Sequence, residues 1–170
     1  MKKMELAQKM RDVHAELQQL DAVSSLSLLS KRLSDETDPL YAFELKITKA
    51  KLLSSLGRSR EAVDILNECS RSMVADESAA YFAAEILVEG GHLAEATDFL
   101  ERAELQIKES RSAYYSDCIF LLHAFCEASH GNAERASELL ARVSDRDEAL
   151  NWLKTETVIS FDAVKKLIAS

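Results

Sequence analysis

Apolar residues recur along most of this chain at the three- and four-residue spacings of amphipathic helices. One such pattern begins after Asp38-Pro39, places Leu45 and Leu52 on one face, and stops at Gly57. Asp before Pro is typical of a helix start, and Gly after the last apolar residue is typical of a helix end. The same punctuation predicts six helices between residues 38 and 143 and gives no strand pattern.

Few turn-forming residues interrupt these patterns, since the 170 residues include four Gly and one Pro. A β-rich fold usually needs more of both. We therefore expect an all-α fold without a sheet, organised as one domain over residues 1–170. Two helices are expected within residues 4–36, and capping helices within 146–170. There Ser160 would begin a last amphipathic helix that carries Phe161, Val164, Leu167 and Ile168.

Five positions recur at constant offsets. Ala50, Gly57, Ala62, Ile65 and Leu66 return 34 residues later as Ala84, Gly91, Ala96, Phe99 and Leu100, and a further 40 residues later as Ala124, Gly131, Ala136, Leu139 and Leu140. The alanines would lie where two antiparallel helices approach most closely, and the glycine would take the positive φ that ends the first helix. Each helix pair leaves an apolar face open, so the pairs are expected to stack.

A 34-residue period with two small residues around a turn glycine resembles the tetratricopeptide repeat. The resemblance implies a right-handed α-solenoid of three helix pairs, at residues 43–76, 77–110 and 117–145. Lys46 and Ala80 depart from the family pattern, which frequently has an aromatic residue there. Glu127 replaces the large apolar residue seen as Leu53 and Leu87. The six extra residues before the third pair predict a longer second helix in the second pair.

The resemblance also implies a binding surface, because the first helix of each pair lines a concave groove in tetratricopeptide proteins. Carrying over the register gives Ile47, Lys51 and Ser54 in the first pair, Tyr81, Glu85 and Val88 in the second, and Cys118, Leu121, Phe125 and Ala128 in the third. Large side chains among them would anchor an apolar peptide. The alternative is that the flanking helices fold into the groove and bury these residues.

Net charge and cysteine content limit the classes of partner and the cellular compartment that we expect. A net charge of −8 disfavours nucleic acid and anionic membranes. Three cysteines cannot all pair within one chain, which favours a reducing compartment, and no stretch has the roughly 18–20 apolar residues that span a bilayer. A cytoplasmic location is expected. No catalytic or cofactor-binding motif is present, so we expect neither an enzyme nor a cofactor.

Three functional hypotheses follow. The first is an adaptor or chaperone that holds a peptide or helix of another protein in the groove. The second is an oligomerising structural subunit, for instance a homodimer that pairs through the C-terminal helix. The third is a metal site at His123, Cys126 and His130, whose spacings share one helix face. Against the third, His123 and Cys126 would face neighbouring helices, and His130 would suit a helix C-terminus.

Overall fold

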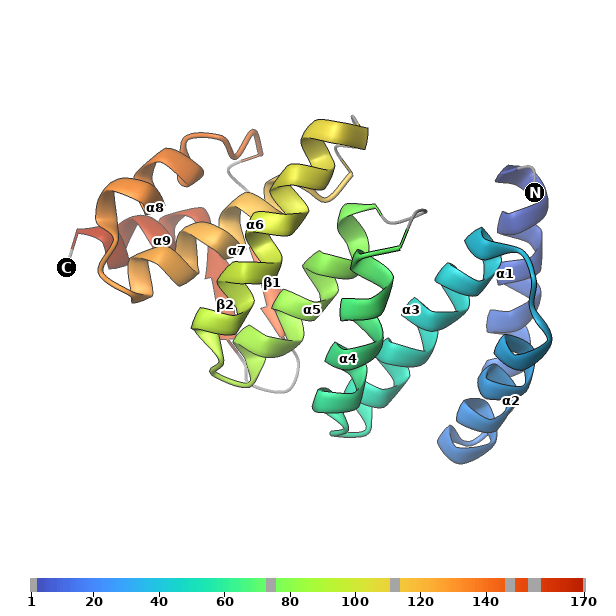
Figure 1. Cartoon of the computed structure of the whole chain (residues 1–170). Helices are drawn as coiled ribbons and strands as arrows, with labels where there is room; N and C mark the ends of the chain where they lie inside the picture. Colours follow the sequence, from blue (N-terminus) through green and yellow to red (C-terminus); the bar gives the residue numbers. More distant parts are fainter. Residues whose placement is uncertain (1–2, 73–75, 111–113, 146–148, 153–156, 170) are drawn as a thin grey trace. The chain divides into compact units, whose positions relative to one another are not determined.

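The computed structural model of the chain describes residues 3–72, 76–110, 114–145, 149–152 and 157–169. They fall into two compact units, residues 1–75 and 76–170. Most of the described residues are helical, as expected, and the second unit also holds a small sheet (Figure 1). Within the described ranges, every helix is too short or too polar to cross a membrane.

The described residues of the first unit, 3–72, form four helices. They are α1 (Lys3–Leu17), α2 (Ala22–Asp35), α3 (Pro39–Ser55) and α4 (Ser59–Ser70). The carboxylate of Asp38 accepts hydrogen bonds from the backbone N–H groups of Leu40 and Tyr41, which confirms the expected start of α3. Helices α1 and α2 pack against α3 around a core formed by Val13, Leu29, Tyr41 and Leu45.

In the second unit, the part of the chain that the structure describes forms five helices and two strands. They are α5 (Glu77–Glu89), α6 (Leu93–Ser110), α7 (Ser116–Ser129), α8 (Ala133–Leu140), β1 (Ala149–Trp152), β2 (Thr157–Ser160) and α9 (Phe161–Ile168). The expected pairs form in both units, because α3 packs on α4, α5 on α6, and α7 on α8. In the second unit α6 also packs on α7.

The three turns that close these pairs have the same backbone conformation. Gly57, Gly91 and Gly131 have φ of 77°, 79° and 82°. In each turn the glycine N–H donates to the carbonyl three residues back, and the following N–H donates to the carbonyl five residues back. This is the Schellman pattern of a helix C-terminus. The positive φ expected at these glycines is therefore confirmed.

The small residues of the repeat are buried as expected. Ala50, Ala62, Ala84, Ala96, Ala124 and Ala136 all have 0% exposed surface. The expected lengthening of one helix is also confirmed, since α6 has 18 residues and α4 has 12.

The expectation of a chain without strands is wrong at its C-terminal end. Residues Ala149–Trp152 and Thr157–Ser160 pair as antiparallel strands, with Leu150 opposite Ile159. Both of these side chains are buried, whereas Val158 is exposed. This alternation, together with β-branched residues, favours a half-buried strand over a helix. Capping helices were expected over 146–170, of which residues 146–148, 153–156 and 170 lie outside the described part; within 149–152 and 157–169, α9 is the helix that forms, and the Ser160 hydroxyl accepts from the Ala163 N–H at its start.

The starts of two helices lie close to the expected pairs. Arg58 occupies the N-cap of α4 and Ser59 is its first helical residue. Helix α7 begins at Ser116, one residue before the expected third pair.

Candidate functional site: an apolar pocket and a buried ionic cluster

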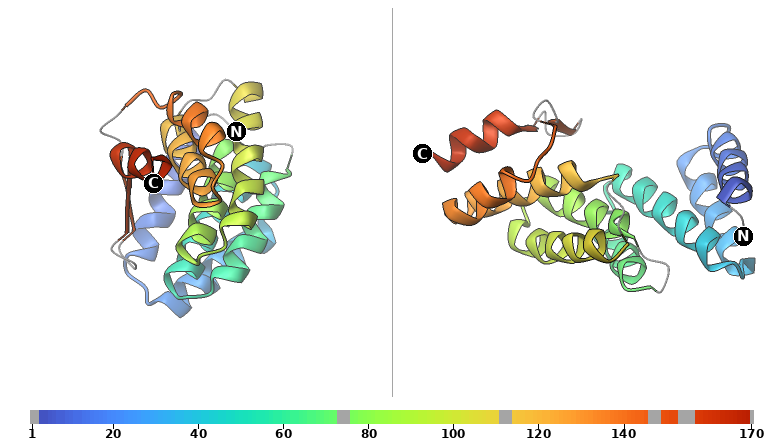
Figure 2. Two further views of the ribbon diagram at one scale, coloured as in Figure 1. Left: turned by 90° about the vertical axis from the view of Figure 1, so that its left-hand side faces the viewer. Right: turned by 90° about the horizontal axis from the view of Figure 1, so that it is seen from above.

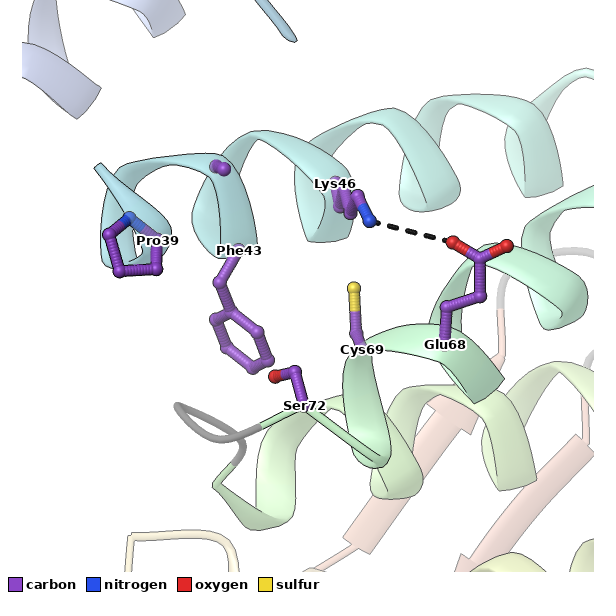
Figure 3. Close-up of a pocket in the computed structure, with 7 residues that line it drawn as sticks. Pro39, Phe43, Lys46, Glu68, Cys69 and Ser72 are labelled. Atoms are coloured by element: carbon purple, nitrogen blue, oxygen red, sulfur yellow. Dashed lines mark hydrogen bonds and ion pairs between the residues drawn. The ribbon is translucent and has the colours of Figure 1, made fainter. Parts of the chain in front are cut away.

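An apolar pocket of about 240 Å³ opens between α3 and α4 in the first unit (Figure 3). It is lined by Pro39, Ala42, Phe43, Lys46, Glu68, Cys69 and Ser72. The Phe43 ring, from α3, and the Cys69 thiol, from α4, line the pocket (Figure 3). Burial raises the pKa of the Cys69 thiol to about 11, so this sulfur is protonated near neutral pH and contributes apolar surface.

The pocket exists because Lys46 does not fill it. Its ammonium group lies at the rim, 3.5 Å from the Glu68 carboxylate, and both side chains are substantially exposed (Figure 3). Lys46 is a residue at which the chain departs from the tetratricopeptide pattern it resembles, since that pattern frequently has an aromatic residue there. An aromatic ring there would bring far more apolar volume to this space than a lysine whose charged end stays in water.

The structure buries about half of the residues predicted to line a groove. Ile47, Ser54, Tyr81, Val88 and Leu121 have between 0% and 8% of their surface exposed. Lys51 is exposed, and Glu85, Cys118, Phe125 and Ala128 are half-buried. On α7, where the last four of the predicted positions lie, β1, β2 and α9 all pack against the helix. Phe125 is the predicted large apolar anchor that keeps an accessible surface.

Tyr81 is held in a cluster of aromatic rings. Its ring stacks on Tyr115 with centroids 5.2 Å apart and lies 5.3 Å from the Phe82 ring. Its hydroxyl donates a hydrogen bond to Glu85, with an O–O distance of 3.1 Å. Burial raises the pKa of Tyr81, so this hydroxyl remains protonated. Tyr81 therefore contributes to the fold of the second unit.

A buried ionic cluster joins α6, α7 and α8. Nδ1 of His123 lies 2.6 Å from Oε1 of Glu104, and both side chains are almost fully buried. The other carboxylate oxygen of Glu104 accepts a hydrogen bond from the guanidinium of Arg142. Arg135 contributes a second guanidinium, 3.5 Å from Glu104. The cluster therefore links three helices and the segment that follows α8.

Opposing effects set the pKa of Glu104. Burial alone would raise it, but the hydrogen bonds from His123 and Arg142 outweigh burial and lower the pKa to about 2. Glu104 is therefore ionised at neutral pH, and His123 Nδ1 is the donor toward it. Arg142 is fixed further by the Phe120 ring, because its guanidinium carbon lies 3.8 Å from the ring centroid.

Glu127 gives the cluster its second carboxylate. Its Oε1 lies 3.3 Å from Nε2 of His123, without an aligned hydrogen bond, and its Oε2 accepts from the Asn132 amide at 2.6 Å. Glu127 is the residue that departs from the apolar pattern of Leu53 and Leu87. The polar residue is accommodated because the Asn132 amide supplies a hydrogen-bond donor to its carboxylate.

The proposed ligands His123, Cys126 and His130 do not gather around one point. Among the described residues, no group of three His, Cys, Asp or Glu side chains is arranged to hold a metal ion. His123 faces Glu104 and Glu127, Cys126 is buried, and His130 is exposed at the C-terminal end of α7. Burial raises the pKa of the Cys126 thiol to about 12, so the free thiol is protonated at neutral pH.

Sequence reasoning missed both the pocket and the cluster, although each coincides with a departure from the repeat. Lys46 marks the pocket and Glu127 marks the cluster. Glu104 had a weaker signal, since it stands 34 residues after Ser70, where the first pair has a small polar residue. A residue that breaks a repeat pattern at a core position was thus the available clue in each case.

Comparisons of the chain with known protein families, with curated proteins and with solved structures find no match.

Proposed function

We propose that this chain is a protein-binding module, of the adaptor or chaperone type, that receives an apolar side chain of its partner in the pocket between α3 and α4. The observation that carries the proposal is the pocket itself, with Phe43 and Cys69 on its walls and a charged rim. At about 240 Å³ it is smaller than the roughly 300–1,000 Å³ that enclose drug-sized ligands. Its size suits one large apolar side chain.

The rim supports a peptide more than a small apolar molecule. Lys46 and Glu68 are 41% and 71% exposed, so their mutual ion pair is weak and each can pair with a partner. Such an arrangement has an apolar anchor site at its centre and polar contacts around it, which is the usual anatomy of a protein interface. The net charge of −8 also favours a protein partner over nucleic acid.

A peptide selection tests this proposal. The purified chain is used to select from a displayed library of random peptides, and the best binders are synthesised and titrated. We expect selected peptides to share one Leu, Met or Phe. Ala42→Phe places a ring at the pocket wall and should weaken binding at least ten-fold, about 1.4 kcal/mol. Ser55→Phe is the control, because Ser55 is exposed on the same helix and does not line the pocket.

Two outcomes contradict the proposal. One is that selection yields no peptide above background. The other is that Ala42→Phe and Ser55→Phe bind the selected peptide as tightly as the parent while all three unfold at the same temperature. A Phe125→Ala variant in the same titration tests whether the accessible part of the predicted groove contributes to binding.

A further inference from the structure

Helix α9 is a short amphipathic helix that packs against α7 and α8 in the second unit (Figure 2). Val164 is fully buried, and Phe161, Leu167 and Ile168 are half-buried. Lys165 and Lys166 stand on the exposed side. The helix thus presents an apolar face to α7 and α8 and two cations to solvent.

The surface on which α9 lies belongs to an acidic part of the chain. Between residues 76 and 145 the sequence contains 14 Asp and Glu and 5 Lys and Arg, a net charge of −9 (5 − 14). Helix α9 has one acidic residue, Asp162, and two basic ones. Helix α9 is therefore a basic element in an acidic unit, with its two lysines on the solvent side, and long-range attraction to the net negative charge favours a basic helix at this place.

Helix α9 is too short to be stable by itself. It has eight residues, whereas isolated helices shorter than about 12–15 residues are marginal in water. The strands that precede it have four residues each, and an isolated two-stranded hairpin is also marginal. The chain is fixed just before this segment, because the Asp117 carboxylate accepts from the N–H groups of Ser144 and Asp145. Helix α9 therefore depends on its contacts with α7 and α8 for stability, whereas the turn before the segment is held by hydrogen bonds of its own.

We propose that the surface of α7 and α8 beneath α9 is a second binding site, whose partner is an amphipathic helix with an apolar face and basic flanks. In the free protein α9 occupies this site and competes with that partner. The inference rests on the proposed function in holding that the chain binds proteins. It uses different residues, however, so the pocket and this site can fail separately.

A labelled peptide corresponding to residues 157–170 serves as the probe, since α9 itself defines the chemistry of the partner. Val164→Asp places a charge in the buried contact and should release α9. Fluorescence anisotropy should then show the peptide binding at least ten-fold more tightly to Val164→Asp than to the parent. Ala163→Asp is the matched control: it adds the same charge at an exposed neighbouring position and should behave like the parent.

The chemistry of the site is tested with a second peptide. A version with Lys165→Glu and Lys166→Glu should bind Val164→Asp more weakly, and the difference should shrink at high salt. Equal binding of both peptides would overturn the requirement for basic flanks. Failure of the first peptide to bind a folded Val164→Asp variant, as judged by circular dichroism, would overturn the site. Adding Ala42→Phe to Val164→Asp should leave peptide binding unchanged, which separates this site from the pocket.

Amide hydrogen exchange on the parent chain keeps the inference testable even when Val164→Asp does not fold. Amides of α9 should exchange faster than those at the centre of α7, because α9 opens without global unfolding. If the amides of α9 and of central α7 exchange at the same rate, through global unfolding alone, α9 does not open separately and the proposed competition is wrong. The mass of the parent chain in solution tests whether the site is occupied by α9 of a second copy. A dimer in which the two copies exchange α9 would mean that the occupant is a second copy and not the proposed partner.

Discussion

Nδ1 of His123 and Oε1 of Glu104 lie 2.6 Å apart at a position where neither side chain has appreciable exposure to solvent. This contact joins α7 to α6, and the same carboxylate also binds Arg142, beyond the end of α8. One ionised side chain therefore ties together three successive parts of the second unit. Its removal leaves two buried or half-buried donors without their acceptor.

The first prediction concerns the pH dependence of stability. The folded pKa of Glu104, about 2, lies below its ordinary value of 4.5, so ionised Glu104 stabilises the folded state. This contribution is complete above about pH 5 and is lost as the pH falls from 4.5 toward 2. Glu104→Gln should lower the free energy of unfolding by about 3 kcal/mol at pH 7, and the difference from the parent should narrow below pH 4.5.

Glu101→Gln is the control for this comparison, because Glu101 lies on the same helix but is exposed. Denaturant titrations of the three proteins at pH 7, 4 and 3 measure the effect. A Glu104→Gln variant that differs from the parent by the same amount at every pH would contradict the ionic contribution.

The second prediction concerns the turn glycines. Gly91 has a φ of 79° with open space around its Cα, so Ala at this position meets no atom but takes an unfavourable backbone conformation. Gly91→Ala should destabilise the protein by about 1–2 kcal/mol. Gly90 has a φ of −84°, and an added methyl group would lie 3.2 Å from Cδ2 of the exposed His92 side chain, which would have to shift by a few tenths of an ångström. Gly90→Ala should therefore change the free energy of unfolding by less than half as much, as measured by urea titration.

The third prediction concerns the close packing of α5 and α6. Ala96 has no exposed surface, whereas Ala94 on the same helix is exposed. Ala96→Leu should destabilise the protein by roughly 1–3 kcal/mol, because the added carbons have no space. Ala94→Leu should have little effect. Equal melting temperatures for the two variants would show that the alanine does not set the distance between the helices.

The fourth prediction concerns the aromatic cluster. Tyr81→Ala should lower the free energy of unfolding by about 3 kcal/mol, because it removes a buried ring and the contact with Tyr115. Tyr114 is 84% exposed although its ring also touches Tyr115, so Tyr114→Ala should have a much smaller effect. Chemical denaturation followed by circular dichroism compares the two. A Tyr81→Ala protein as stable as the parent would contradict a structural role for Tyr81 and would leave it as a candidate groove residue.

Features governed by the local backbone could be predicted from the sequence. The turn at Gly57 has a positive φ, which glycine adopts without strain whatever the distant contacts are. Asp38 before Pro39 indicates a helix start because its carboxylate accepts from the first backbone N–H groups of the helix. The regular offsets of small residues then predicted which helices pair. Each of these signals involves residues that are close in sequence or repeat at a fixed spacing.

The candidate sites depend on contacts between distant side chains, and these the sequence did not specify. Glu104 and Arg142 are 38 residues apart, and nothing in either local pattern indicates that they meet. The burial of Leu121 likewise reflects the packing of the second unit, in which a short sheet and α9 lie on α7. The strands were missed because neither Ala149–Trp152 nor Thr157–Ser160 alternates strictly between apolar and polar residues along the sequence.

The added length of α6 has a consequence for how this chain tolerates change. The register of α4 and α6 matches from Ser59 and Leu93 onward, so the extra residues of α6 fall at its C-terminal end, beyond the part that pairs with α5. Leu105, at the start of this extension, is 56% exposed. We expect insertion of a whole helical turn here to leave the Gly91 turn in place, because that turn lies at the opposite end of α6. We therefore expect the C-terminal end of α6 to accept an inserted segment or a change in chain length.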